Sequence, residues 1–263
     1  MSGRSESGCK SRDLIAWARS TRKNAVKLRK VTAAQRARIR EQRCRCEEPP
    51  PPTALPDVAD EPSGPMADTL VTVGGSAGAI ASACEVIAAL PATFRAAIVV
   101  ALHGATEGDL VRIVRRCARH VVRWAVNGEP LREGCIYVAA PGHHVIVNPD
   151  RCLTVSRKPR VRFFRPSVDW LFESAAAAFE DRHIAVVLSG RLDDGAAGVR
   201  CVTRMGGVAL AEDPAFCLFG AMPRAAVQTG CVTASLSRPR IAAELVRLTD
   251  CAVSPSEPPF SAT

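Results

Sequence analysis

The sequence predicts an α/β protein built on a single doubly wound, mainly parallel sheet of the Rossmann-like type, with helices on both faces. Short runs of consecutive apolar residues recur between residues 70 and 188. They lack the alternation of a half-exposed strand, as strands buried on both faces require. Helix-forming stretches separate the runs, which is typical of a sheet covered on both sides. The 263 residues, 47% of them hydrophobic, are enough for one full-sized core.

Four apolar runs are the predicted strands, at residues 70–73, 97–102, 136–139 and 184–188. The predicted helices cover residues 79–90, 107–120, 167–180, 196–205 and 238–250. We expect Ser167 to cap the third helix and either Asp193 or Asp194 to cap the fourth, where carboxylates suit the positive end of the helix dipole. Ligands in such sheets bind beyond the carboxyl ends of the strands, so the chemistry is expected at that edge.

The formal charge of +9 is unevenly distributed along the chain. Residues 1–45 hold 14 lysines and arginines against three acids, whereas residues 46–263 hold 21 against 23. We predict a basic arm over 1–45, partly helical or disordered, a proline-rich linker over 46–65, a folded domain over 66–252 and a disordered tail over 253–263. The domain begins at Met66, and a second hypothesis is that translation starts there.

Composition also limits the partners and the cellular location. Only 5% of residues are aromatic, so a base-stacking nucleic-acid surface is not expected, and the basic arm is expected either to bind an acidic partner or to be merely solvated. The 11 cysteines are scattered, and the spacing of Cys44 and Cys46 does not suit zinc, which indicates a reducing compartment. No signal peptide and no transmembrane segment are recognisable, so the sequence predicts a cytoplasmic protein.

A glycine-rich turn, Gly74-Gly75-Ser76-Ala77-Gly78, joins the first predicted strand to the first helix. It satisfies G-x-S-x-G in the strand–turn–helix context that lifts a nucleophilic serine over the end of the strand. The N–H of Ala77, at a helix N-terminus, would serve a developing oxyanion beside Ser76. Two alternatives stay open, a phosphate-binding turn and a serine that only caps the helix. The first lacks the second glycine of G-x-G-x-x-G.

A base and an acid follow two other predicted strands. His103 ends the second strand at the same edge as Ser76, and its imidazole can take the serine proton if the two strands are neighbours. Asp193 and Asp194 follow the fourth strand, and either can orient the histidine while the other caps the next helix. The pair His143-His144 lies in a loop without a matched third ligand, so neither a metal site nor a cofactor is predicted.

Together these segments resemble the catalytic domain of CheB-type protein-glutamate methylesterases, over about residues 69–235. The stretches that carry the resemblance, in the order and spacing of the family, are 74–78, 102–103, 137–142, 165–169, 194–198 and 220–224. The resemblance implies a serine esterase of bacterial chemotaxis that demethylates the cytoplasmic domains of methyl-accepting chemoreceptors, with glutamine deamidation as a related activity. It makes Ser76 the nucleophile, His103 the general base and Asp194 the orienting acid, because the aspartate of the family directly precedes Gly-Ala.

The sequence departs from the family beside each of these residues. The replaced positions are Gly75, Ala77 and Ala79 at the serine turn, Gly104 and Ala105 after the histidine, and Arg191 and Leu192 before the aspartate. The loop before the aspartate helps to form the oxyanion site in relatives, so the predicted oxyanion and substrate site comprises Ala77, Gly75 and Arg191.

Two other functions are therefore kept beside the methylesterase. One is a catalytically degenerate domain that binds receptors or signalling proteins, and the other is an esterase acting on a small-molecule ester. Family members usually carry a phosphorylatable receiver domain. Residues 1–65 are too short for one and lack its acidic pocket, so no phosphorylation switch is expected in this chain.

Overall fold

The computed structural model describes residues 64–104 and 109–252. The predicted arm over 1–45, most of the predicted linker and the predicted tail lie outside these residues. The described chain forms a seven-stranded sheet in the order β3-β4-β2-β1-β7-β8-β9, in which every neighbouring pair is parallel. The strands are β1 (Leu70–Gly75), β2 (Ala97–Leu102), β3 (Val121–Trp124), β4 (Cys135–Val138), β7 (His183–Val187), β8 (Val208–Glu212) and β9 (Ala234–Leu236).

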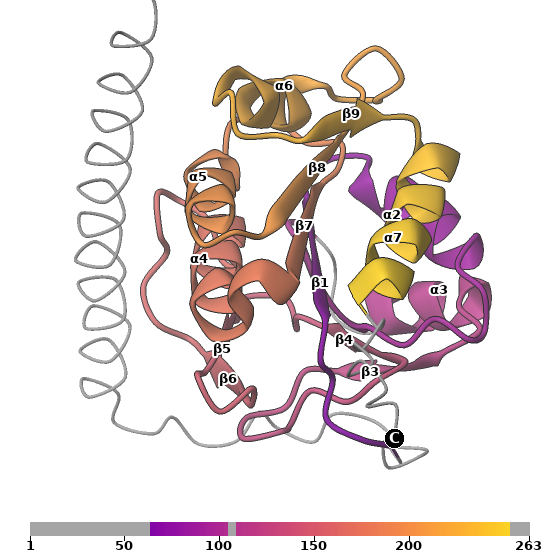
Figure 1. The fold of residues 1–263 in the computed structure, drawn as a ribbon. Helices are drawn as coiled ribbons and strands as arrows, with labels where there is room; N and C mark the ends of the chain where they lie inside the picture. Colours follow the sequence, from indigo (N-terminus) through magenta and orange to yellow (C-terminus); the bar gives the residue numbers. More distant parts are fainter. Residues whose placement is uncertain (1–63, 105–108, 253–263) are drawn as a thin grey trace, which may run out of the picture. The chain divides into compact units, whose positions relative to one another are not determined.

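Helices cover both faces of this sheet, so the predicted fold class is confirmed. Figure 1 shows α4 (Val168–Phe179) and α5 (Ala196–Arg204) on one face, with α2 (Ala79–Ala88), α3 (Asp109–Cys117) and α7 (Arg238–Ala252) on the other. The helix α6 (Ala221–Gln228) lies near the carboxyl ends of β7 and β8, and the 3-10 helix η1 (Glu180–Arg182) leads into β7. An antiparallel hairpin of β5 (His144–Val147) and β6 (Leu153–Ser156) packs against α4. No helix of the described chain is long and apolar enough to cross a membrane.

The two faces of the sheet bury two separate apolar cores. The core under α4 and α5 contains fully buried Leu171 and Phe172, and the core under α2, α3 and α7 contains Leu90 and Leu245. Every residue of β1 and β2 is buried, because the sheet is covered on both sides at its centre. This explains why these strands read as uninterrupted apolar runs.

All the predicted strands and helices are present, with ends shifted by a few residues. The predicted helix over 107–120 is described from Asp109 to Cys117, and the predicted strand over 184–188 begins one residue earlier, at His183. The sequence analysis did not predict β3, β8, β9, the β5–β6 hairpin or α6. Two of these, β3 and β9, are the edge strands of the sheet, and both are partly exposed.

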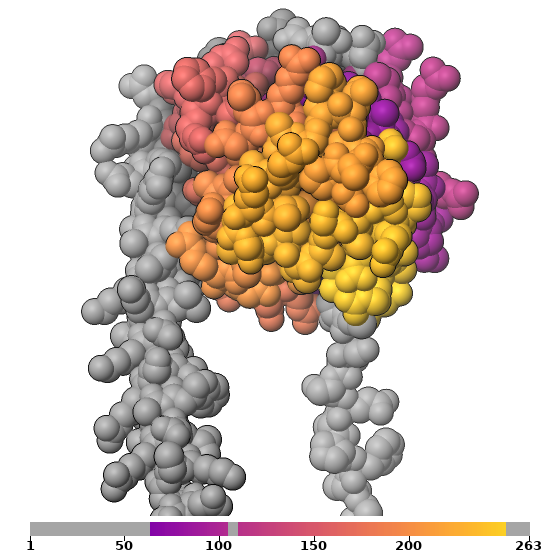
Figure 2. Space-filling model, turned by 90° about the horizontal axis from the view of Figure 1, so that it is seen from above, coloured from indigo at the N-terminus to yellow at the C-terminus, as the bar shows by residue number. Residues whose placement is uncertain are grey.

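The register at the centre of the sheet fixes the site. Gly75 at the end of β1 pairs with Leu102 at the end of β2, and Gly74 pairs with Val187 at the end of β7. The segments that follow these three strands therefore leave the sheet together, on the side where Figure 1 shows α6. Figure 2 looks onto this side from above, where the orange and yellow segments that include α6 and α7 cover the middle of the view.

Candidate active site

The turn that carries Ser76 is locked into the edge of the sheet. The N–H of Ser76 donates to the carbonyl of Ser189, at 3.0 Å, and the N–H of His103 donates to the carbonyl of Gly75, at 3.0 Å. Gly78, with φ of +81°, is the N-cap of α2 and no side chain caps this helix. The structure therefore does not support the interpretation of Ser76 as a helix cap.

Two buried residues that the sequence analysis missed hold this turn from behind. The hydroxyl of Ser189 donates to the carbonyl of Ala77, at 2.9 Å, and the N–H of Ser189 donates to Glu212 Oε2, at 2.8 Å. Glu212 is almost fully buried and also accepts from the hydroxyl of Ser82, at 3.1 Å. The one sequence signal for them is a polar residue at the end of an apolar strand, since Ser189 follows β7 and Glu212 ends β8.

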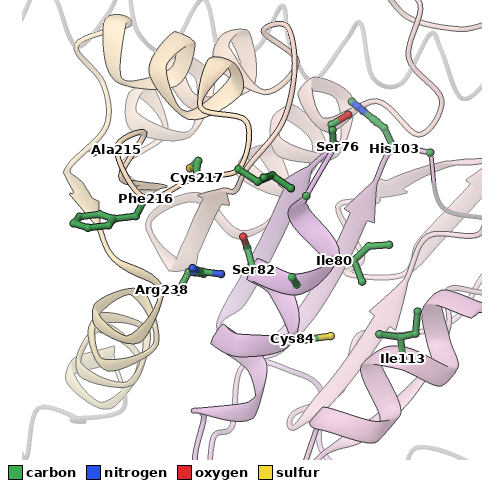
Figure 3. A pocket seen from close by; sticks show the side chains of 15 residues that line it. Ser76, Ile80, Ser82, Cys84, His103, Ile113, Ala215, Phe216, Cys217 and Arg238 are labelled. Atoms are coloured by element: carbon green, nitrogen blue, oxygen red, sulfur yellow. The ribbon is translucent and has the colours of Figure 1, made fainter.

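His103 is bound to Asp194 and faces Ser76. Its Nε2 lies 2.9 Å from Asp194 Oδ2, in a contact where the two side chains are 11% and 2% exposed. Its ring stacks on Phe164, with centroids 4.6 Å apart and planes 13° from parallel. Figure 3 shows the hydroxyl of Ser76 and the imidazole of His103 pointing toward each other.

The hydrogen bonds assign the tautomer of His103. The carboxylate of Asp194 accepts, so Nε2 carries the proton when the imidazole is neutral. Nδ1 is buried and has no hydrogen-bond partner among the described residues. Its lone pair is thus the one that can accept the proton of a neighbouring hydroxyl, which is the chemistry of a general base.

Asp194 directly precedes the N-cap of α5 in the chain, but its carboxylate lies at the N-terminus of α4. Its carboxylate accepts from the N–H groups of Val168, at 2.7 Å, and Asp169, at 3.0 Å, and the hydroxyl of Ser167 lies 3.4 Å away. Two N–H groups at the start of a helix thus hold the carboxylate in the position from which it binds His103.

One of the predicted caps is present and the other is wrong. Ser167 is the N-cap of α4, since its side chain accepts from the N–H of Trp170. For α5 the N-cap is Gly195, with φ of +99° and no side-chain cap. Neither aspartate caps α5, because Asp194 turns to α4 and Asp193 pairs with Arg162, at 2.5 Å.

Asp169 completes a reciprocal arrangement that was also missed. Its Oδ1 accepts from the N–H groups of Gly195, at 2.9 Å, and Gly198, at 2.8 Å, at the start of α5. Asp169, on α4, thus binds the start of α5, and Asp194, just before α5, binds the start of α4. Burial, with a smaller contribution from the negative charge of Asp194, raises the pKa of Asp169 to about 6.

A mostly apolar hollow of about 1160 Å³ opens beside Ser76 and His103. Its apolar lining comes from α2, α3 and the loop after β8, including Ile80, Phe216 and Leu218. Figure 3 shows these elements around the hollow, with Ser76 and His103 at one end. The structure therefore offers space for a substrate next to the hydroxyl.

The predicted oxyanion and substrate residues are not all brought to this hollow. Ala77 lines it. Gly75 is buried in β1, where an added Cβ would overlap that of Ala79. The guanidinium of Arg191 lies over the ring of Phe219, 4.6 Å from its centroid, and Arg191 is not part of the lining.

The two loop histidines have structural partners. His144 Nδ1 accepts from the N–H of Ser167, at 3.1 Å, its Nε2 donates to the carbonyl of Pro159, and burial lowers its pKa. His143 Nε2 accepts from Arg157, at 2.7 Å. In the described part of the chain no group of three or more His, Cys, Asp or Glu side chains is placed to hold a metal ion.

Comparisons with known proteins agree with one another. The family model "CheB methylesterase" matches residues 71–245. A Leptospira interrogans protein, provisionally named protein-glutamate methylesterase/protein-glutamine glutaminase, is 35% identical over 180 residues, which are 68% of this chain and 93% of that protein. The protein-glutamate methylesterase FrzG of Myxococcus xanthus is 32% identical over 89% of this chain and 66% of its own length. The crystal structure of the Thermotoga maritima CheB methylesterase catalytic domain superposes with a TM-score of 0.65 at 28% identity, covering 71% of this chain and 99% of that one.

Proposed function

Since the chain belongs to the CheB methylesterase family, we propose that it is a serine hydrolase that removes methyl groups from glutamate γ-methyl esters on methyl-accepting chemoreceptors. The cytoplasmic domains of these receptors would be its substrates in chemotaxis signalling. Deamidation of receptor glutamines is proposed as a second activity of the same site. One observation carries the proposal: Ser76 and His103 meet at one hollow, with His103 bound through Nε2 to a buried Asp194.

The proposed reaction uses His103 first as a base and then as an acid. Nδ1 of His103 takes the hydroxyl proton of Ser76 as Oγ attacks the ester carbonyl, and Asp194 stabilises the resulting imidazolium. The N–H of Ala77, in the turn that leads into α2, would stabilise the oxyanion of the tetrahedral intermediate. The imidazolium then protonates the leaving methoxide, which departs as methanol. Water activated by His103 hydrolyses the acyl-serine, which leaves a free glutamate and the starting enzyme.

The test is methanol release from methylated cytoplasmic fragments of chemoreceptors, comparing the wild-type chain with Ser76→Ala. We expect the substitution to lower kcat by at least about 10³-fold, because Ser76 carries the hydroxyl that faces His103. Ser235→Ala, which changes an exposed serine of the edge strand β9, is the matched control and should retain full activity.

Two outcomes would favour the other functions. A wild-type chain that is folded by circular dichroism and binds the receptor fragment without releasing methanol would favour a degenerate binding domain. Hydrolysis confined to small neutral esters, lost in Ser76→Ala, would favour a small-molecule esterase.

A further inference from the structure

We propose that the loops beside Ser76 form a docking surface for an acidic polypeptide segment with apolar residues, which presents the ester to the hollow. The inference rests on the proposed function and deepens it by naming the chemistry of the substrate around the scissile ester. The surface, called the basic rim below, consists of residues 157–165 together with Arg191 and Leu192.

The basic rim concentrates positive charge. Its longer segment has five basic side chains and no acidic one: Arg157, Lys158, Arg160, Arg162 and Arg165. Of the four arginines in it, only Arg162 meets a carboxylate of the described residues. Arg160 donates to the carbonyl of Phe163, at 3.1 Å, and is exposed. Such a surface attracts carboxylates and repels other cations.

The same rim exposes two large apolar side chains. Phe163 is 85% exposed and Leu192 is 62% exposed. Both have left-handed backbone, with φ of +81° and +67°, which is rare for residues other than glycine, asparagine or aspartate. Strained backbone that holds apolar side chains in solvent is characteristic of functional surfaces, because nothing in the packing of the fold requires it.

Direct contacts place the rim at the edge of the active site. Phe164, the neighbour of Phe163, stacks on the ring of His103. The ion pair between Arg162 and Asp193 joins the segment to the loop of Leu192, because Asp193 lies between Leu192 and Asp194. A polypeptide lying on the rim would therefore bring its side chains within reach of His103 and the hydroxyl beside it.

Apolar side chains also flank the other side of the site. Phe216 and Leu218, in the loop after β8, are 64% and 76% exposed and line the hollow. Exposed apolar groups thus stand on both sides of a concave site, with positive charge on one side. This arrangement suits a polypeptide that crosses the site and dips one side chain into it, more than a flat anionic membrane, which would favour a single protruding group.

The experiment uses two peptides of equal length, each carrying one glutamate γ-methyl ester and two leucines. The remaining positions are aspartate in the acidic peptide and asparagine in the neutral one. For the full chain we expect kcat/KM to be about tenfold higher on the acidic peptide at low salt, and the preference to shrink as salt screens the rim. Arg160→Glu should reduce the acidic-to-neutral ratio about tenfold, whereas Phe163→Ser should raise KM for both peptides.

The matched control is Arg204→Glu, the same change of charge on an exposed residue in the last turn of α5. It should leave the acidic-to-neutral ratio unchanged. A ratio near one in the active wild-type chain, or a ratio insensitive to Arg160→Glu, would overturn the docking surface while leaving the methylesterase intact. Binding of the chain to phosphatidylglycerol vesicles through Phe163, with no preference for the acidic peptide, would overturn it in favour of a membrane. Ser76→Ala tests the proposed esterase separately from the docking surface. If the esterase is correct, this substitution abolishes hydrolysis of both peptides.

Discussion

His103 illustrates how a single hydrogen bond decides the role of an imidazole. Because Nε2 faces Asp194, the nitrogen left for the hydroxyl of Ser76 is Nδ1. The ring is also fixed in its plane by stacking on Phe164. The two contacts come from segments that follow β6 and β7 in the chain, so the orientation of the base depends on loops far from it in sequence.

The ionisation of Asp169 should change the unfolding free energy of the protein as the pH varies. Its pKa of about 6 lies above the ordinary value for an aspartate, so the folded state binds this proton more tightly than the unfolded state does. Its contribution to stability is therefore present at low pH and is lost as the pH rises from about 4 to about 6. Relative to Asp169→Asn, the wild-type chain should gain about 2 kcal/mol of unfolding free energy between pH 7 and pH 4.

Urea denaturation of both proteins across this range measures the difference. Asn can still accept the N–H groups of Gly195 and Gly198 through its carbonyl, whereas Asp169→Ala cannot and should be destabilised by about 2 kcal/mol at pH 7. A wild-type chain that loses stability relative to Asp169→Asn on acidification would contradict the assignment.

At the scale of elements, the close contact of α4 with α5 sets the distance between the two aspartates. A Cβ on Gly198 would lie 2.6 Å from that of Phe172 and 3.2 Å from the backbone of Asp169. Gly198→Ala should therefore lower the unfolding free energy by about 2 kcal/mol, although alanine is ordinarily the better helix former by about 1 kcal/mol. It should also lower kcat, because α4 carries the N–H groups that hold Asp194.

Thermal denaturation and the methanol assay check this prediction together. Arg200→Ala, on the exposed side of the same helix, is the control and should change stability by less than about 0.5 kcal/mol. A Gly198→Ala protein as stable as the wild type would mean that α4 and α5 can separate freely.

The strands that could be predicted from sequence are those that are buried along their whole length. Strands β1, β2, β4 and β7 are buried on both faces, and their sequences are apolar except for Thr72 and His183, whose side chains bind each other. At the sheet edges, β3 alternates between half-buried and buried residues and β9 has only three residues, so neither stands out from a loop. The β5–β6 hairpin lacks a two-residue turn, and five residues join its strands.

The residues of the candidate site likewise divide into those that the sequence could predict and those that it could not. Ser76, His103 and Asp194 follow strand ends, and a rule about parallel sheets places such residues at one edge. Ser189, Glu212 and Asp169 act through backbone N–H and carbonyl groups of segments between 23 and 112 positions away. No local sequence pattern indicates such distant partners, so the roles of these residues could be identified only in the structure.

At the scale of the whole molecule, one sheet joins two cores that do not touch each other. Along β1 the side chain of Leu70 enters one core and that of Val71 enters the other. Disrupting the packing of one core therefore displaces strands whose other side chains pack in the second core, and so destabilises that core as well. We expect the described domain to unfold in one cooperative transition.

Two tryptophans allow this to be measured. Trp124 lies in the core under α2 and α3, while Trp170 is on α4 against His144. In full chains that retain only one of them, with the other and Trp17 replaced by phenylalanine, the fluorescence transition in urea should coincide with loss of far-ultraviolet circular dichroism. Separate midpoints for Trp124 and Trp170, each differing from the dichroism of its own variant, would show that the layers unfold independently.

The central position of β1, between β2 and β7, has a consequence for engineering the protein. The three segments proposed to carry out the reaction leave adjacent central strands. The basic rim and one part of the lining of the hollow, residues 215–218, belong instead to connections between elements. Directed evolution could therefore be confined to residues 157–165, 191–192 and 215–218, leaving the strands untouched. A library of this kind would change the substrate preference of the proposed hydrolase while keeping the scaffold that aligns Ser76, His103 and Asp194.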